Sequence, residues 1–367
     1  MKLKKNKFKI LFSIIFFLLI TELFSYTYIK INPKINLDSD KVEDGQNLKK
    51  YYFKPHHYYA LEVNPEYISE SIKVNQYGLR GKPINEKQKN EIRIACLGGS
   101  TTQDMISDEK FTYTNLLETK LNGYYKHKNK FVSVINGGVG TYTTAETLIA
   151  YIFKIYHLNP DMIIIYHGIN DLITQVYYKK SYPDNRQYRK VWEDKNHNLP
   201  DFYYFLKNHF YFFKFIHYVF FKNKQYDVWS VSLNKLDFSD KYDNPESLQN
   251  VEKNNFGEYF RYNLQSLITL GLTQKKTIIL TTFIGDEKYC TQAEIRGLKK
   301  INYIIRKLSA DNNIYLFDLE KIYNETPPEK SIFLPEDSVH FNEYGNEWRS
   351  AHLFNYLLEN KIIDKIN

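Results

Sequence analysis

The chain has 367 residues, of which 43% are hydrophobic and 25% are charged, a balance that excludes wholesale disorder. The formal net charge is +8, but five lysines lie in the first nine residues (Lys2, Lys4, Lys5, Lys7, Lys9). The remaining excess is too small and too dispersed to indicate a nucleic-acid surface. Two cysteines cannot form a disulfide framework or a four-cysteine zinc site, and no phosphate-binding glycine loop is present. We therefore expect no metal and no cofactor.

The amino terminus carries an apolar stretch, residues 10–29, whose only charge is Glu22. A helix of about 20 residues spans roughly 30 Å, the thickness of a bilayer core. Residues 21–28 offer no small-residue cleavage site, so an uncleaved anchor over residues 1–30 is favoured over a cleaved signal peptide or a buried helix. Lysines at the amino end place that end in the cytoplasm. We expect a single-pass transmembrane helix, with everything after about residue 30 outside the cell membrane.

The rest of the chain divides into a polar connector with edge elements over residues 31–90 and a main domain over residues 91–367. Apolar, mostly β-branched or aromatic runs predict five strands: Ile92–Leu97, Phe131–Asn136, Met162–His167, Thr277–Phe283 and Ile314–Asp318. Helical patterns lie between and after them: Tyr113–Leu121, Thr143–His157, Glu258–Leu270, Ala293–Leu308 and Glu343–Leu358. This alternation predicts right-handed βαβ units and a parallel sheet.

An aromatic-rich insert at about residues 174–254 interrupts the alternation of strands and helices. One interpretation is an extra amphipathic helix that packs on the main domain or on a membrane surface. The other is a lid over the functional site. The sequence does not separate the two.

Residues that can carry chemistry stand after several of the predicted strands. Ser100 follows two glycines after the first strand, Gly138 ends the second, and Asn170 follows the third. Asp337 and His340 come after the last strand, just before a helix. Alone, each fits a helix cap, a loop or a surface pair. Because the carboxyl ends of parallel strands form one edge of a sheet, we expect all five to meet there.

Together these residues have the composition of a Ser-His-Asp site. Ser100 would attack a carbonyl carbon, His340 would take the serine proton, and Asp337 would hold the imidazole in the required tautomer. The N–H groups of Ser100 and Gly138 and the side-chain amide of Asn170 would stabilise the developing oxyanion.

The same segments resemble the motif blocks of the SGNH/GDSL hydrolases. Ser100 matches the serine of the first block, Gly138 the glycine of the second, and Asn170 the asparagine of the third, while Asp337 and His340 match the D-x-x-H of the fifth. The resemblance covers roughly residues 72–360, apart from the insert. It implies a flavodoxin-like three-layer α/β/α sandwich with a parallel five-stranded sheet, and metal-free hydrolysis of acyl or acetyl esters.

Two positions depart from the family pattern. Gly99 replaces the aspartate of G-D-S, and Gln103-Asp104 stand where a glycine often follows the serine-threonine run. The second departure leaves the shape of the substrate pocket open.

We interpret the chain as a membrane-anchored serine esterase that removes O-acyl groups, O-acetyl above all, from an acylated carbohydrate such as a cell-envelope glycan or a lipid-linked sugar. An O-acetyltransferase using the same triad is an alternative, because a sugar hydroxyl can resolve the acyl-enzyme in place of water. A catalytically silent scaffold or binding protein of the envelope is a second alternative.

Overall fold

A computed structural model describes residues 2–31, 52–56, 58, 60–69, 72–128, 130–176, 206, 209–221 and 245–366. The chain forms two compact units. One comprises Met1–Leu48 and Gln187–Asp237, and the other comprises Lys49–Arg186 and Phe238–Asn367. Most of the predicted insert lies outside the described residues, so its role as a packing helix or a lid stays a prediction.

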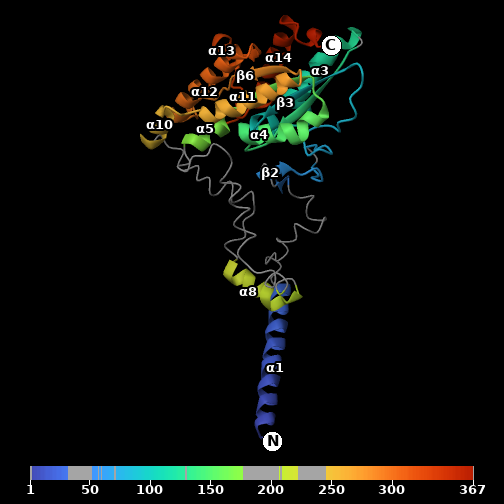
Figure 1. Ribbon diagram of the computed structural model, residues 1–367, viewed down its shortest axis with the longest axis vertical. Helices are drawn as coiled ribbons and strands as arrows, with labels where there is room; N and C mark the ends of the chain where they lie inside the picture. The colour runs from blue at the N-terminus through green and yellow to red at the C-terminus, as the bar shows by residue number, and fades with distance from the viewer. Residues whose placement is uncertain are drawn as a thin grey trace. The chain divides into compact units, whose positions relative to one another are not determined.

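The larger unit is built on a parallel sheet with strand order β4-β3-β5-β6-β7 (Figure 1). The strands are β3 (Glu91–Gly98), β4 (Phe131–Gly138), β5 (Met162–Tyr166), β6 (Thr277–Thr281) and β7 (Tyr315–Phe317). All five match predicted strands, and the predicted parallel flavodoxin-like sheet is confirmed. The strand that follows β3 in sequence, β4, lies on one side of it, and β5, β6 and β7 lie on the other side, so the strand order switches between β3 and β5. Ligands of such sheets bind outside the carboxyl ends of the strands at this switch point.

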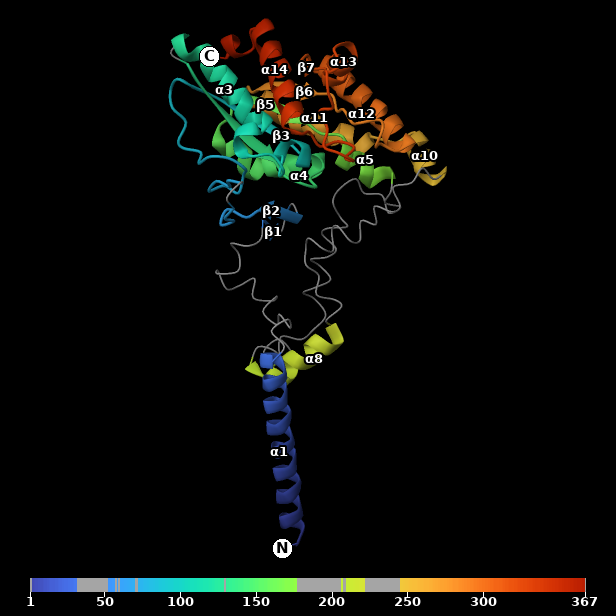
Figure 2. The same cartoon turned by 180° about the vertical axis from the view of Figure 1, so that it is seen from behind.

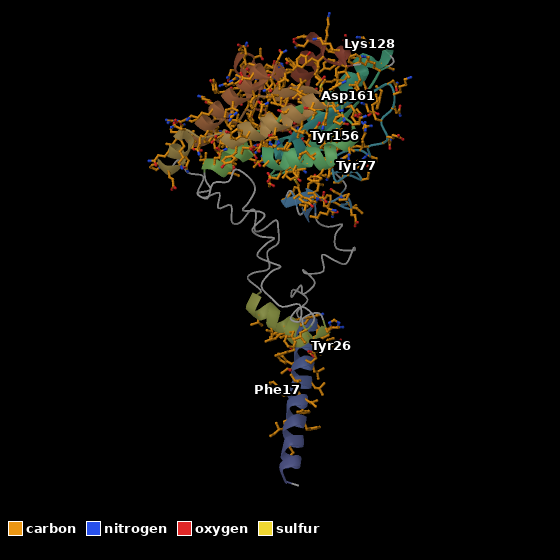
Figure 3. All side chains as sticks on the ribbon, in the orientation of Figure 1. Phe17, Tyr26, Tyr77, Lys128, Tyr156 and Asp161 are labelled. Atoms are coloured by element: carbon orange, nitrogen blue, oxygen red, sulfur yellow. The ribbon has the colours of Figure 1, made fainter. Side chains whose placement is uncertain are left out.

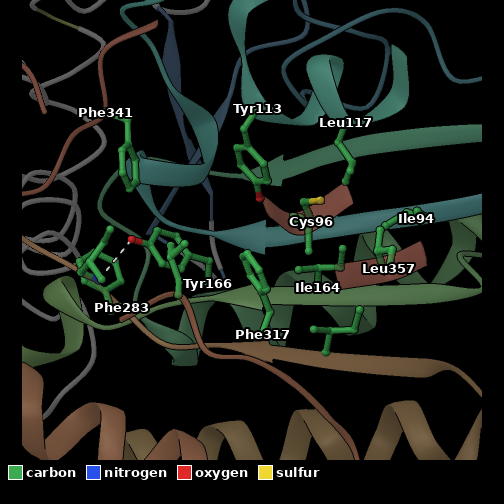
Figure 4. Packing of buried hydrophobic residues seen from close by; sticks show 14 of the residues in the cluster. Ile94, Cys96, Tyr113, Leu117, Ile164, Tyr166, Phe283, Phe317, Phe341 and Leu357 are labelled. Atoms are coloured by element: carbon green, nitrogen blue, oxygen red, sulfur yellow. Dashed lines mark hydrogen bonds between the residues drawn. The ribbon is translucent and has the colours of Figure 1, made fainter. Parts of the chain in front are cut away.

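Both faces of the sheet are buried, which explains the apolar runs without polar alternation. In β3, Ile94 and Cys96 pack in one core cluster, whereas Ala95 and Leu97 pack in the other. Side chains of a strand point to opposite faces in turn, so neighbouring residues enter different cores. Figure 4 shows Ile94, Cys96 and Ile164 in the first cluster, against Leu117 and Leu357.

Helices cover both faces of the sheet. Seen from the front (Figure 1), α4 (Thr144–Ala150), α11 (Glu258–Thr273) and α12 (Gln292–Asp311) cover it, and from behind (Figure 2), α3 (Tyr113–Tyr125) and α14 (Glu343–Glu359) do. The remaining helices of this unit are α2 (Ser100–Gln103), α5 (Ile169–Val176), α10 (Pro245–Glu252) and α13 (Leu319–Glu325). The helix predicted to run to His157 continues after α4 as a π-helical turn, Tyr151–Ile155, and a 3₁₀ turn, Tyr156–Leu158.

The connector contributes a small antiparallel hairpin, β1 (Phe53–His56) and β2 (Ala60–Val63). The Tyr142 hydroxyl, from the loop after β4, donates to the Leu61 carbonyl at 2.7 Å. The buried side chains of Tyr52, Leu61, Val63, Val139 and Tyr142 form a separate apolar cluster. The hairpin is therefore fixed on the loop that follows β4.

The smaller unit contains α1 (Lys2–Ile31) and α8 (Tyr211–Phe221). The carboxylate of Glu22 accepts the backbone N–H groups of Tyr211 and Phe212 at 2.7 and 2.9 Å, which caps the start of α8. The ring edge of Tyr26 contacts Tyr211 at a centroid distance of 4.9 Å. Phe17, farther toward the amino end, is exposed (Figure 3). Glu22, the one charge of the apolar stretch, thus has a hydrogen-bonding role within this unit.

The transmembrane assignment of residues 1–30 is not supported. Among the helices in the described part of the chain, none combines the length and apolar character that a membrane crossing needs. The helix itself forms where it was expected, but its strongly apolar run, Ile10–Ile20, is shorter than the roughly 20 residues that a bilayer core demands.

Candidate active site

The sharp turn after β3 places Ser100 at the carboxyl edge of the sheet. A Cβ atom added to Gly99 would lie only 2.6 Å from Nδ2 of Asn170, so a side chain at position 99 would displace that amide. Glycine therefore allows Asn170, from the start of α5, to come close to the turn that carries Ser100. Ser100 is also the first residue of α2, where backbone N–H groups have no intrahelical acceptor.

Three side chains at this edge form a hydrogen-bonded series. Nε2 of His340 lies 2.8 Å from Oγ of Ser100, although 240 positions separate the two residues in the chain. Nδ1 of His340 lies 2.7 Å from Oδ2 of Asp337. The structure thus brings together the serine, imidazole and carboxylate that the sequence analysis singled out, in the order that proton transfer requires.

Asp337 is held as a charged acceptor. Its Oδ1 accepts the backbone N–H groups of Val339 and His340, both at 2.8 Å. Burial raises the pKa of this carboxyl group, but the hydrogen bond and charge of His340, with the two N–H groups, outweigh it and lower the pKa to about 2. The carboxylate is therefore ionised at neutral pH and fixes the orientation of the imidazole.

The loop that carries the pair is tied at several points. The backbone N–H of Leu334 donates to the His340 carbonyl at 2.9 Å, and the stacked rings of Phe333 and Phe341 lie 5.3 Å apart. The Asn342 side chain then caps α14 by accepting from Gly345 N–H at 2.8 Å. These contacts set the imidazole on a rigid support rather than on a free loop.

Asn170 offers a donor beside Ser100. One N–H of its amide donates to the Tyr142 carbonyl at 2.9 Å, which fixes the amide plane. A primary amide has two N–H groups. The second one, together with the Ser100 N–H, can meet negative charge on a substrate oxygen.

The N–H of Gly138, the expected third donor, is donated to Oδ1 of Asn136 at 3.1 Å in this structure, and its role toward a substrate oxygen stays a prediction. The glycine of this segment that lies beside Ser100 is Gly140: a Cβ atom added there would be 4.0 Å from the Ser100 Cβ. Its N–H donates to Oε1 of the buried Gln103 at 2.7 Å. Nothing in the sequence indicated this contact: Gly140 stands two positions beyond Gly138, and Gln103 stood out only as a departure from the family pattern.

Residues 96–348 match the model of the GDSL-like lipase/acylhydrolase family. The chain belongs to this family. It is therefore a carboxylic ester hydrolase of the GDSL type, as the sequence resemblance implied.

Solved structures of low sequence identity are similar to the chain. An acetyl xylan esterase, AlAXEase, is 17% identical, with 72% of this chain and 100% of that one covered, at a TM-score of 0.42. A lipase/acylhydrolase from Enterococcus faecalis is 15% identical over 72% of this chain and 95% of its own, at 0.43. The acetylxylan esterase Axe2 from Geobacillus stearothermophilus is 14% identical over 73% and 95%, at 0.43. No curated protein matches the chain.

Replacing Asn170 by alanine should lower kcat of this hydrolase by about 10²–10³, because the predicted oxyanion donor is then lost. KM should change little, since the donor acts mainly on charge that develops in the transition state. The measurement is steady-state hydrolysis of p-nitrophenyl acetate. Asn122→Ala is the matched control: Asn122 also donates its amide to a backbone carbonyl, that of Val132 at 2.7 Å, but near the opposite end of the sheet. Equal kcat for the two variants would contradict the assignment.

Behind Asn170 lies a buried pair, His167 and Asp171. Nε2 of His167 is 2.8 Å from Oγ1 of Thr147, and burial lowers the pKa of this imidazole to about 3. Burial raises the pKa of Asp171 to about 7, against the lowering effect of its hydrogen bonds from Thr144. As the pH falls, His167 takes up its proton more readily in the unfolded chain, which lowers the stability of the folded state. Asp171 takes up its proton more readily in the folded chain, which raises that stability. Between about pH 4 and 6.5 the two effects oppose each other.

We expect His167→Gln to remove the histidine effect alone. Relative to wild type, the free energy of unfolding of the variant should rise by roughly 1.4 kcal/mol per pH unit as the pH falls from 6.5 to 4. Urea titrations at several pH values measure this. His157→Gln, at an exposed position, is the control and should follow wild type. A constant difference across this range would show that His167 is not the group responsible.

Proposed function

We propose that this hydrolase cleaves O-acyl esters with Ser100 as nucleophile, His340 as general base and Asp337 as the orienting carboxylate. The observation that carries the proposal is the unbroken series of two hydrogen bonds, 2.8 Å from Ser100 to His340 and 2.7 Å from His340 to Asp337. A binding module has no need of all three groups in this order.

Acylation begins when Oγ of Ser100 attacks the carbonyl carbon of the ester while its proton passes to Nε2 of His340. The carbonyl oxygen becomes an oxyanion that accepts from the Ser100 N–H and the Asn170 amide. Collapse of the tetrahedral intermediate breaks the bond to the leaving oxygen, which takes the proton from His340. An alcohol leaves, and the acyl group stays on Ser100.

Deacylation repeats these steps with water. His340 takes a proton from the water molecule as its oxygen attacks the acyl carbon, and then returns this proton to Oγ of Ser100. The products are a carboxylic acid and the free enzyme. A sugar hydroxyl in place of water would transfer the acyl group instead.

The proposed substrate is an O-acetylated carbohydrate, a cell-envelope glycan or a lipid-linked sugar. A small acyl group suits the crowded space next to Ser100: a Cβ atom added to Gly140 would lie 3.3 Å from Cζ of Phe53 and 4.0 Å from Cβ of Ser100. A side chain at position 140 would therefore meet both the Phe53 ring and Ser100.

Incubation of the full chain with O-acetylated envelope polysaccharide, followed by measurement of free acetate, tests the proposal. Release of acetate by wild type and not by Ser100→Ala supports an esterase. With an added deacetylated glycan, new acetyl esters on that glycan would assign a transferase instead. If no acetate, no transfer and no hydrolysis of p-nitrophenyl acetate were observed, the silent scaffold would be the better description.

We further propose that the amino-terminal segment associates with a membrane and that the enzyme acts outside the cytoplasm. Support comes from the lysines at the amino end and from the exposed apolar side chains of α1, among them Phe16, Phe17 and Leu19. Cell fractionation with a carbonate wash tests the membrane association. Protease digestion of intact cells tests whether the enzyme lies outside the cytoplasm. Recovery of the full chain in the soluble cytoplasmic fraction would refute both.

Phe53→Ala should widen the range of acyl groups that the enzyme accepts. Removal of the ring opens space beside the nucleophile, so the ratio of kcat/KM for p-nitrophenyl hexanoate to that for the acetate should rise by about 10-fold or more. Phe131→Ala, at the amino end of β4, is the control and should leave this ratio unchanged. An unchanged ratio in Phe53→Ala would show that the ring does not limit the acyl group.

A further inference from the structure

Asp104 occupies an unusual position directly after the helix that begins with Ser100. Its backbone is left-handed, with φ 53° and ψ 73°, a conformation that favours glycine. Its N–H donates to the Ser100 carbonyl at 2.8 Å, so its backbone is tied to the nucleophile. Its side chain is buried. The chain thus keeps a strained, buried aspartate where glycine would fit more easily.

The Asp104 carboxyl group leads into a line of hydrogen bonds that reaches α14. Its Oδ1 accepts from the Ser107 N–H at 3.1 Å, and its Oδ2 accepts from Nδ2 of Asn346 at 2.6 Å. Oδ1 of Asn346 in turn accepts from Nη2 of Arg349 at 3.1 Å. Asn346 and Arg349 belong to α14, the helix that follows the His340 loop.

Arg349 contacts the neighbours of both reacting side chains. Its Nη2 donates to the carbonyl of Thr101, next to Ser100, at 3.2 Å. Its guanidinium lies 4.4 Å from the ring of Phe341, next to His340, and 3.7 and 5.2 Å from the rings of Tyr113 and Tyr166. Figure 4 shows these three rings, which come from three separate parts of the fold.

Burial of the Arg349 guanidinium costs the folded state free energy. Within the described part of the chain, Nε and Nη1 of the buried Arg349 have no hydrogen-bond acceptor. Buried cations with unpaired N–H groups destabilise proteins unless other contacts compensate. If this position served packing alone, an apolar side chain of similar size would give a more stable protein. A role beside stability is therefore indicated.

We propose that Asp104, Asn346 and Arg349 form a clamp that sets the position of Ser100 relative to His340. The three are positioning residues, since none of them belongs to the reacting series. Arg349 and Asn346 hold the two ends of α2, at Thr101 and Asp104, against α14, while Phe341 ties the same guanidinium to the His340 loop. The proposal rests on the proposed function of Ser100 and His340.

Asp104→Gly tests the clamp most directly, because glycine suits the left-handed backbone while the carboxyl group is lost. We expect kcat for p-nitrophenyl acetate to fall by about 10–100-fold with KM within about twofold, since misplacement of a reacting group acts on the chemical step. The rate of Ser100 labelling by a fluorophosphonate should fall in parallel. A role in stability alone would lower the melting temperature and leave kcat per folded molecule unchanged.

The double variant Asp104→Asn with Asn346→Asp exchanges the two side chains and tests whether activity is restored. It restores a carboxyl–amide hydrogen bond between positions 104 and 346 and places the carboxyl group beside Arg349. We expect kcat within about threefold of wild type, whereas Asn346→Ala should resemble Asp104→Gly. This pattern would not arise if the aspartate served only to terminate α2.

Arg349→Lys and Arg93→Lys form a matched pair. Both arginines are buried, but Arg93 lies near the amino end of β3, where it pairs with Glu91 at 2.7 Å. Both variants should lose stability, and only Arg349→Lys should lose kcat at a temperature where both are folded, because lysine cannot reproduce the planar stacking.

Wild-type kcat in folded Asp104→Gly, or equal kcat in the two lysine variants, would overturn the clamp. If Arg349→Lys fails to fold, Asp104→Gly and the double variant Asp104→Asn with Asn346→Asp decide the question. Failure of the proposed function looks different: wild type itself would then neither hydrolyse the ester nor be labelled at Ser100.

Discussion

Ser100→Ala should lower kcat for p-nitrophenyl acetate by about 10³–10⁶, the largest loss expected from any single substitution in this chain. Alanine keeps the Cβ atom and the turn after β3, but it removes the oxygen that lies 2.8 Å from Nε2 of His340. No acyl-enzyme can then form. The remaining rate reflects water attack assisted by binding and by the Asn170 amide. Stopped-flow detection of nitrophenolate would also lose its burst phase if deacylation limits turnover in wild type.

Ser338→Ala is the control for this experiment, because Ser338 lies in the same loop as His340 and between Asp337 and Val339. Its kcat should stay within about twofold of wild type, as expected for a substitution outside the reacting series. Thermal unfolding should show that both variants are folded. A Ser100→Ala variant with more than a tenth of the wild-type kcat would require another nucleophile and would remove the proposed mechanism.

The parts of the fold that follow from local pattern could be predicted. The strands of the sheet are short apolar runs because both faces are covered by helices, and that pattern is visible without knowledge of the fold. Asp337 and His340 are three positions apart in one loop, so their contact is almost a local property. Ser100 and Asn170 follow β3 and β5, and the parallel topology brings the ends of these neighbouring strands together.

The features that were missed depend on contacts between distant segments. Which acceptors the N–H groups of Gly138 and Gly140 meet depends on backbone angles after β4, which glycine leaves unrestricted. Phe53 packs next to Gly140 from a hairpin that the sequence showed only as an edge element. The line from Asp104 to Arg349 crosses 245 positions and leaves no periodic signal.

Asp337→Asn should lower kcat by about 10⁴ while leaving the loop in place. The amide oxygen can still accept the N–H groups of Val339 and His340, as Oδ1 does now at 2.8 Å. The amide nitrogen, however, would take the place of Oδ2 and cannot accept from Nδ1–H of the imidazole. The ring would then carry its proton on Nε2, the atom that must receive the proton of Ser100. KM should change little, because the substrate does not contact this carboxylate in the proposed mechanism.

Asp318→Asn is the control, because Asp318 likewise accepts backbone and side-chain hydrogen bonds, as the cap of α13. Its pKa is lowered too: burial raises it, but the hydrogen bonds from Arg306, Lys321 and Thr282 outweigh burial. Its loss should reduce stability without a selective loss of kcat. A further test combines Asp337→Asn with Ser100→Ala. If Asp337 acts only through His340 on Ser100, the double variant should be no slower than Ser100→Ala alone. Additive losses would mean that the carboxylate serves the reaction by a route that does not pass through the serine.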